Sequence, residues 1–183
     1  MKKRIRELLK PLILLLVKMK IHPNILTSIH FILGFLSAYL ILRRLFLSGG
    51  ILYLISSTCD FLDGAVAEFS GKKTKVGAIY DSVSDRIQEG IILLAIALIV
   101  KEFLLPFIAL FTGFLISYTK TRAEAEGIKV NVGLFTRPIR SIVLGVTIIF
   151  KLFPSGLYVL IVGNTITFLH RFIYAFVKGR RQK

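Results

Sequence analysis

The chain alternates long apolar stretches with short polar segments, many of them basic. Six stretches approach or exceed the length of about 20 residues that a helix needs to cross a bilayer. They cover residues 25–46, 51–69, 76–100, 103–121, 138–150 and 155–177. The fifth is short for a span, and the turn signal Ser48-Gly49-Gly50 separates the first two. The pattern therefore predicts an all-α integral membrane protein with six transmembrane helices.

The segment before the first stretch has a different pattern. Residues 2–19 read KKRIRELLKPLILLLVKM, with basic residues on one side of a helix and leucines on the other. Such a segment is typical of a juxtamembrane amphipathic helix, which Pro11 would kink or divide in two. The expected organisation is one membrane domain over residues 1–183, with the amphipathic helix at 1–20 and the six-helix core at 24–177.

Composition supports a membrane location. Hydrophobic residues make up 55% of the 183 residues, and the mean hydropathy is +0.74. Soluble domains are nearer to about 45–50% apolar. The net charge of +15 could indicate a nucleic-acid binder, but such proteins do not carry this much apolar sequence. Contact between basic loops and anionic lipid explains the charge more simply, so we expect the bilayer and not nucleic acid as partner.

The basic residues also predict an orientation. With six spans, the two termini, the second loop and the fourth loop lie on one side of the membrane. That side carries nineteen Lys and Arg residues, and the other side carries four. Because basic loops remain in the cytoplasm, both termini should be cytoplasmic, in the plasma membrane.

Two pairs of aspartates stand at helical spacing inside the apolar sequence. Asp60 and Asp63 are three residues apart in the second stretch, and Asp81 and Asp85 are four apart near the start of the third. Each pair therefore lies on one helical face, and the short loop makes the two helices neighbours. A charge inside a span costs about 2.5–3.5 kcal/mol on insertion scales, so such residues indicate function.

Four carboxylates this close need a cation to remain ionised. Oxygen-only ligands favour hard ions such as Mg²⁺ or Mn²⁺. Gly64 and Gly77 next to the aspartates would let helices pack closely or a ligand reach the backbone. The alternative is that the aspartates are helix-end acids facing the basic loop residues Lys72, Lys73 and Lys75, which would explain only one or two of them.

The segment from Asp60 to Asp85, DFLDGAVAEFSGKKTKVGAIYDSVSD, resembles the signature of the CDP-alcohol phosphotransferases, D-x2-D-G-x2-A-R-x8-G-x3-D-x3-D. Seven of its eight fixed positions match with every spacing kept. The departure is Glu68, where the family has Arg. Because Glu would repel a diphosphate, we do not assign nucleotide binding to position 68.

The resemblance extends over residues 22–175. The segment HPNILT, residues 22–27, is similar to the P-N-x-L-T run that opens the first span in the family. The segment SYTKTRAEAEGIKVNVGLFTRPIR, residues 117–140, is similar to the corresponding stretch of the phosphatidylinositol-phosphate and archaetidylinositol-phosphate synthases. The resemblance implies six spans around a polar cavity that opens to the cytoplasm, in a homodimer.

The resemblance also implies an enzyme. A CDP-linked lipid, either CDP-diacylglycerol or CDP-archaeol, would bind with its diphosphate on two Mg²⁺ or Mn²⁺ ions, and a hydroxyl of a polar alcohol would displace CMP. Asp85 resembles the general base of the family. The implied metal ligands are Asp60, Asp63, Asp81 and Asp85. The implied CDP-lipid contacts are Asn24, Thr27, Asp60, Gly64, Ala67 and Gly77. The implied contacts to the phosphate of an inositol phosphate acceptor are Ser117, Lys120, Arg137 and Arg171.

Several alternatives stay open. The basic residues of the acceptor group could simply obey the positive-inside rule, and glycerol 3-phosphate is the second candidate acceptor. A cation transporter would also place aspartates inside the membrane, although near its midplane and usually with internal repeats. We expect Arg86 and Glu89 to form a pair on the helix surface or an interface contact, and not to belong to the site. The three histidines, His22, His30 and His170, show no ligand spacing, so the sequence predicts ordinary polar roles for them.

Overall fold

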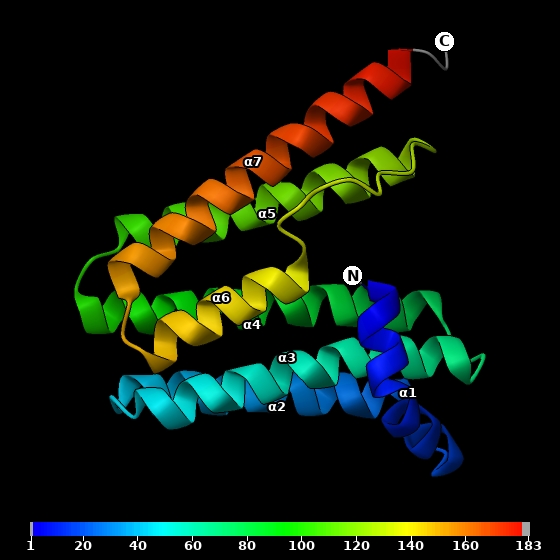
Figure 1. The fold of residues 1–183 in the computed structure, drawn as a ribbon, viewed down its shortest axis with the longest axis horizontal. Coiled ribbons are helices and arrows are strands. Elements are labelled where there is room, and N and C mark those ends of the chain that lie inside the picture. Colours follow the sequence, from blue (N-terminus) through cyan, green and yellow to red (C-terminus); the bar gives the residue numbers. More distant parts are fainter. Residues whose placement is uncertain (1, 181–183) are drawn as a thin grey trace.

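The computed structural model describes residues 2–180, with the side chains of residue 7 and residues 9–180. This part of the chain is all-helical and contains no strand (Figure 1). The seven helices are α1 (Lys2–Lys18), α2 (Pro23–Leu42), α3 (Phe46–Phe69), α4 (Lys75–Val100), α5 (Leu104–Ala125), α6 (Arg137–Ile149) and α7 (Phe153–Arg180).

Local capping sets several of the helix ends. His22 precedes α2 and its Nδ1 accepts a hydrogen bond from the backbone N–H of Asn24 at 3.3 Å, with Pro23 in the first helical turn. Thr74 caps α4 in the same way, because its Oγ1 accepts from the N–H of Gly77 at 3.0 Å. Basic residues in the left-handed conformation follow four helix ends, where their charge also complements the helix dipole. They are Lys20, Arg44, Lys101 and Lys151.

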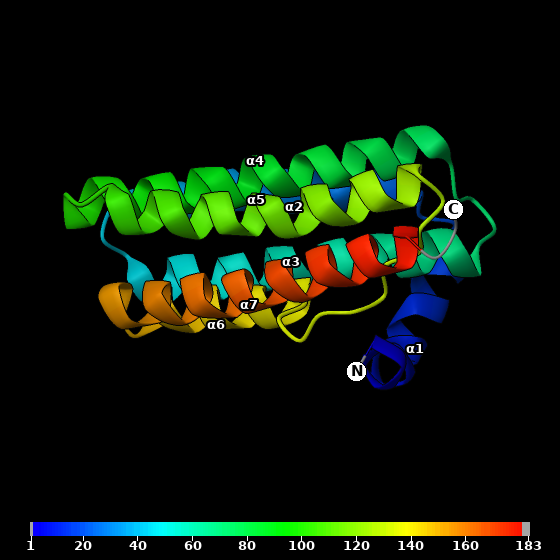
Figure 2. The same cartoon turned by 90° about the horizontal axis from the view of Figure 1, so that it is seen from above.

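Six of the helices form two layers of three. Figure 2 shows α2, α4 and α5 in one layer and α3, α6 and α7 in the other. The bundle has a hydrophobic core that includes Ile41, Ile92, Ile96 and Ile148, all fully buried. Helix α1 crosses the end of the bundle and buries Ile13 against Leu26, Leu62 and Val66 of α2 and α3.

Helix α6 begins part-way along the bundle. The turns α2–α3, α4–α5 and α6–α7 lie at one end, and the segment after α5 starts at the other end (Figure 1). That segment, residues 126–136, runs back along the bundle before α6 starts at Arg137. With 13 residues, α6 is only about 20 Å long. The return of this segment explains why the fifth apolar stretch is short, and it places Arg137 inside the bundle.

Within residues 2–180, four helices are long and apolar enough to cross a membrane: α2, α3, α5 and α7. Their outer faces expose large hydrophobic side chains, among them Ile32, Phe107 and Phe172. Outward apolar surface of this kind suits a helix whose solvent is lipid. Helix α4 carries Asp81, Asp85 and further charged residues, and α6 is short, so composition and length alone do not identify these two as spans.

The predicted turn at Ser48-Gly49-Gly50 is wrong. The chain turns at residues 43–45, and all three of these residues lie inside α3. The two glycines are buried packing positions: a Cβ added to Gly49 would lie 3.0 Å from Ile41 Cγ1, and one added to Gly50 would lie 2.5 Å from Ile149 Cγ1. They let α3 approach α2 and α6 closely. Pro11 does not divide the N-terminal segment, because α1 continues through it.

Candidate active site

The four aspartates of α3 and α4 gather at one place in the bundle. Carboxylate oxygens of Asp60, Asp63 and Asp81 all lie within 4.8 Å of one another, and oxygens of Asp60 and Asp85 meet the same limit. Asp63 and Asp85 are buried, Asp60 is nearly so, and Asp81 is 36% exposed. The two pairs therefore form one cluster that is accessible at Asp81 and closed at Asp85.

Neighbouring side chains fix the orientation of these carboxylates. Thr27 Oγ1 in α2 donates a hydrogen bond to Asp63 Oδ2 at 2.5 Å. The guanidinium of Arg137 spans the cluster: Nη1 lies 2.7 Å from Asp60 Oδ1 and 4.0 Å from Asp81 Oδ1, and Nη2 donates to Asp85 Oδ1. The Asp60 contact is an ion pair without hydrogen-bond alignment, because Asp60 Oδ1 accepts no hydrogen bond. Arg137 thus joins both aspartate pairs.

A second set of ion pairs continues from Asp85 through Arg86 and Glu89 to Arg140. Arg86 Nη2 is 3.7 Å from Asp85 Oδ2 and Arg86 Nη1 is 3.2 Å from Glu89 Oε2, so the predicted Arg86–Glu89 pair forms. The expectation that it lies on the helix surface and outside the site is wrong, because both side chains are largely buried and Arg86 lines the cavity next to Asp85. The pair extends to α6, where the buried Arg140 donates to Glu89 Oε1. Gly113 of α5 makes room for it, since a Cβ there would lie 2.9 Å from Glu89 Oε1.

The charges of this cluster do not balance. The four aspartates and Glu89 contribute five negative charges, and Arg86, Arg137 and Arg140 contribute three positive ones. The formal excess of two negative charges lies in a largely buried environment, where uncompensated charge is costly. A divalent cation bound by carboxylate oxygens would compensate it, so the donor set and its charge both suit a hard dication.

An open cavity of about 1000 Å³ adjoins the cluster. It is large enough to hold a nucleotide and a small polar molecule together. All the predicted site residues line it except Asp85, which lies on a small inner pocket with Gln88, Arg140 and Asn164. The structure thus brings the predicted metal, lipid and acceptor residues into one connected region.

The predicted CDP-lipid contacts lie on the α2, α3 and α4 side of the cavity. Gly64 borders open space, because no atom lies within 4 Å of an added Cβ. At Gly77, by contrast, a Cβ would lie 3.1 Å from Asn24 Oδ1, so glycine permits the close approach of α4 to α2. The hydroxyl of Thr27 is already engaged with Asp63, which makes Thr27 a positioning residue for that carboxylate.

The predicted acceptor group lies on α5, α6 and α7, across the cavity. Lys120 is 39% exposed, and its Nζ lies 3.7 Å from Glu124 Oε1. Ser117 makes a long bond of 3.4 Å to its own helix, at the Gly113 carbonyl. Arg171 donates from Nε to the Val132 carbonyl at 2.9 Å and from Nη1 to the Ile116 carbonyl at 3.0 Å. Arg171 therefore also holds the returning segment in place.

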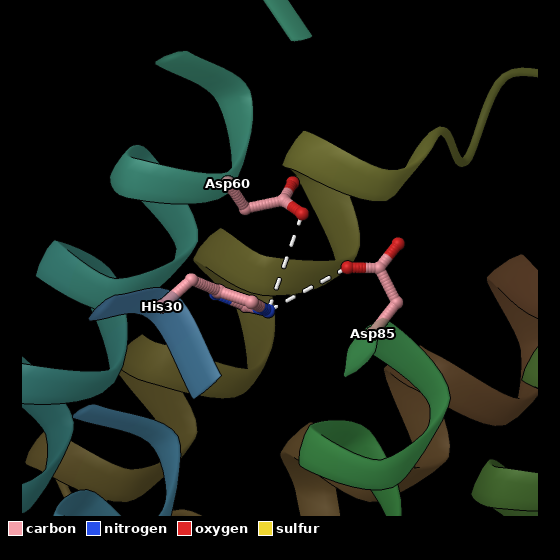
Figure 3. Close-up of side chains that lie close together, drawn as sticks. All are labelled: His30, Asp60 and Asp85. Carbon is pink, nitrogen blue, oxygen red and sulfur yellow. Dashed lines mark ion pairs between the residues drawn. The ribbon is translucent and has the colours of Figure 1, made fainter. Parts of the chain in front are cut away.

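Sequence spacing missed one residue of the site. His30 of α2 is fully buried, and its Nε2 lies 3.5 Å from Asp85 Oδ1 and 4.0 Å from Asp60 Oδ1, so the three side chains point toward one another (Figure 3). The available signal was local: Thr27 and His30 are three residues apart and share a helical face in otherwise apolar sequence. His22 and His170 play ordinary roles, the first as a helix cap and the second exposed on α7.

The helical fold and the aspartate cluster agree with a family match found from the sequence. Residues 20–175 match the model of the CDP-alcohol phosphatidyltransferase family, and the chain belongs to that family.

Two sequence relatives match most of the length of this chain. The chain is 35% identical over 172 residues to an uncharacterized protein of Aquifex aeolicus, covering 90% of this chain and 87% of that one. It is 32% identical over 158 residues to the archaetidylinositol phosphate synthase of Pyrococcus horikoshii, covering 85% and 84%.

A solved structure shares the fold. The phosphatidylinositol phosphate synthase of Mycobacterium tuberculosis with CDP-DAG bound superposes with a TM-score of 0.76 and 27% identity, covering 91% of this chain and 92% of that one. The same enzyme has been solved in complex with manganese and citrate. The chain is therefore a transferase of phospholipid biosynthesis with membrane helices, and not the cation transporter that its aspartates alone also allowed.

Proposed function

We propose that this enzyme transfers the lipid phosphate of CDP-diacylglycerol or CDP-archaeol to a hydroxyl of inositol phosphate and releases CMP. One observation carries the proposal: a single cavity has the carboxylate cluster on one wall and a basic group on the other, and Arg137 of the basic group contacts Asp60 and Asp85 of the cluster. A diphosphate and a phosphomonoester can then approach each other from opposite sides.

Asp60, Asp63, Asp81 and Asp85 would hold two Mg²⁺ or Mn²⁺ ions. When bound, such ions neutralise the diphosphate and the charge that develops during transfer. The charge balance supports two ions, because the cluster carries a formal excess of two negative charges and the diphosphate diester brings two more. A relative crystallised with manganese supports the same type of centre.

Asp85 would act as the general base. The acceptor oxygen forms a bond to the lipid-side phosphorus, the bond from that phosphorus to the CMP oxygen breaks, and the hydroxyl proton passes to Asp85. Arg137 supports this assignment because the same guanidinium contacts Asp85 and borders the cavity. An acceptor phosphate bound at Arg137 would bring a hydroxyl of the same molecule near Asp85.

The basic wall favours a phosphorylated acceptor. Guanidinium and ammonium groups suit a phosphate dianion. Arg137, Arg171 and Lys120 supply these groups, and Ser117 adds one hydroxyl. An unphosphorylated alcohol such as serine would leave this group without a ligand. The names of the archaeal and mycobacterial relatives favour inositol phosphate over glycerol 3-phosphate.

We further propose that α2 to α7 all span the plasma membrane, with α1 in the cytoplasmic interface. The aspartates of α4 and Arg140 of α6 are turned into the bundle, which suits two polar-faced spans shielded by four apolar ones. The excess of basic residues in the segments at one end supports a cytoplasmic location for the termini and the cavity. We expect a homodimer, as the family resemblance implies.

A substrate screen tests the proposal. Purified protein would be given CDP-diacylglycerol or CDP-archaeol with inositol phosphate, glycerol 3-phosphate or serine, and the lipid product would be identified by mass. We expect a phosphoinositol phosphate lipid to form fastest. A glycerol phosphate product at higher kcat/KM would instead identify a phosphatidylglycerophosphate-type synthase, and a serine product would refute the role of the basic wall.

A further inference from the structure

His30 lies at the buried end of the carboxylate cluster. Its side chain is fully buried among α2, α3 and α4, and its Nε2 points at Asp60 and Asp85 (Figure 3). Nε2 has no hydrogen-bond partner, because both carboxylate oxygens are too distant, at 4.0 and 3.5 Å. A buried ring nitrogen without a partner is costly unless it has a ligand.

The contacts of Nδ1 fix the form of the ring. Nδ1 lies 3.0 Å from the Ser56 carbonyl oxygen and 3.1 Å from Ser56 Oγ. The Ser56 hydroxyl donates its single proton to the His30 carbonyl oxygen at 2.7 Å, so toward the ring both Ser56 oxygens only accept. Nδ1 therefore carries a proton. Burial disfavours the charged form of the ring, and a neutral ring would present the lone pair of Nε2 to the carboxylates.

This arrangement is the one that metal-binding histidines adopt. Such a histidine almost always donates its other N–H to a carboxylate or a backbone carbonyl, which fixes the ring orientation. Metal–ligand bonds of about 2.1 Å place neighbouring ligand atoms roughly 3.0–3.4 Å apart. The observed distances of 3.5 and 4.0 Å from Nε2 to Asp85 and Asp60 need only a small contraction to reach that range.

We propose that His30 is a nitrogen ligand of one metal ion, together with Asp60 and Asp85. The inference rests on the metal centre of the proposed function and adds a ligand that the aspartate signature lacks. Arg137 contacts the same two carboxylate oxygens, and its side chain, 33% exposed, can move into the cavity when an ion takes up their charge. An imidazole ligand favours a transition ion such as Mn²⁺ over Mg²⁺.

A purely structural role for His30 explains the contacts of Nδ1 but not the position of Nε2. The bond from Nδ1 to Ser56 joins α2 to α3, and Gln88 of α4 donates to Ser56 Oγ at 2.8 Å. This network would hold the three helices together without any metal. It leaves the buried Nε2 without a hydrogen-bond partner next to two carboxylates, whereas a metal ion between the three groups would bind all of them.

Electron spin echo modulation of bound Mn²⁺ tests the proposal directly. The full chain, purified without a histidine tag and loaded with less than one equivalent of Mn²⁺, should show modulation from a coordinated ¹⁴N. His30→Gln should lose that modulation, and His170→Gln, which changes an exposed histidine, should retain it. We also expect His30→Gln to weaken Mn²⁺ binding at least about tenfold and Mg²⁺ binding less.

Isotope labelling tests the same ligand in the unchanged chain, so this second experiment does not depend on the folding of the His30→Gln variant. ¹⁵N-histidine in the otherwise unchanged chain should replace the ¹⁴N pattern with that of ¹⁵N, and His22→Gln and His170→Gln should leave it unaltered. Bound Mn²⁺ with no histidine nitrogen signal would overturn the His30 inference alone. Failure of the intact chain to bind Mn²⁺ at all would overturn both this inference and the proposed metal-dependent transfer.

Discussion

Lys120 offers the cleanest test of the acceptor site. Arg137 also contacts Asp60 and Asp85, so its removal would disturb the aspartate cluster, and Arg171 also holds two backbone carbonyls. Lys120 has one ion-pair partner, Glu124, and borders the cavity. Lys120→Met keeps the apolar stem of the side chain and removes only its charge.

The size of the expected loss in kcat/KM follows from the exposure of the Lys120 side chain. A charge-assisted contact to a phosphate contributes about 1.5–3 kcal/mol, and partial exposure at 39% favours the lower end. We therefore expect kcat/KM for inositol phosphate to fall about tenfold, mostly through KM. The KM for the CDP-lipid should change by less than about twofold, because Lys120 lies across the cavity from the predicted lipid contacts.

Glu124→Gln is the matched control. It removes the partner of Lys120 but keeps the ammonium group, and an exposed pair of this kind is worth at most about 1 kcal/mol. Steady-state kinetics of both variants, with each substrate varied in turn, separates the two roles. If Lys120→Met and Glu124→Gln have equally small effects, Lys120 serves only a surface ion pair and the acceptor assignment is wrong.

Four further predictions concern the centre and its support. Asp85→Asn should lower turnover at least about 10²-fold while CDP-lipid binding persists, and residual activity above about a tenth would argue against a general base. Chelation should abolish turnover, and added Mg²⁺ or Mn²⁺ should restore it; full activity after exhaustive metal removal would contradict the metal assignment. Glu68→Arg, at an exposed position, should remain active, and a dead variant would show that this carboxylate is required. Gly113→Ala should lower the Tm in detergent because the methyl group would meet the Glu89–Arg140 pair, whereas Gly90→Ala, which meets no atom within 4 Å, should not; equal Tm values would refute the packing argument.

The aspartate cluster could be predicted because its determinants are local. Spacings of three and four place Asp60 with Asp63 and Asp81 with Asp85 on single helical faces. The expectation that the two helices are packing neighbours is wrong, because α3 and α4 lie in different layers and each packs against α2, which brings the two aspartate pairs together. Apolar length likewise predicted most of the helices within a few residues.

The remaining features depend on residues far apart in the chain. Gly49 and Gly50 match a turn signal, and only their three-dimensional neighbours show that they are packing sites. Gly49 lies against Ile41 of α2, and Gly50 lies against Ile149, about a hundred residues later in the chain. The position of Arg137 depends on the return of residues 126–136 along the bundle (Figure 1). The spacing of Thr27 and His30 indicates a shared polar face of α2, but which groups His30 meets depends on α3 and α4 packing against that face.

The central claim is that this cavity joins a CDP-linked lipid to a phosphorylated alcohol. Its most direct test is CMP release by the purified protein in lipid vesicles containing a CDP-lipid and Mg²⁺, measured before and after inositol phosphate is added. We expect little CMP before the addition, and afterwards CMP and a new phosphorylated lipid in equal amounts, with neither formed by Asp85→Asn. CMP release that is independent of inositol phosphate, or that Asp85→Asn retains in full, would contradict it.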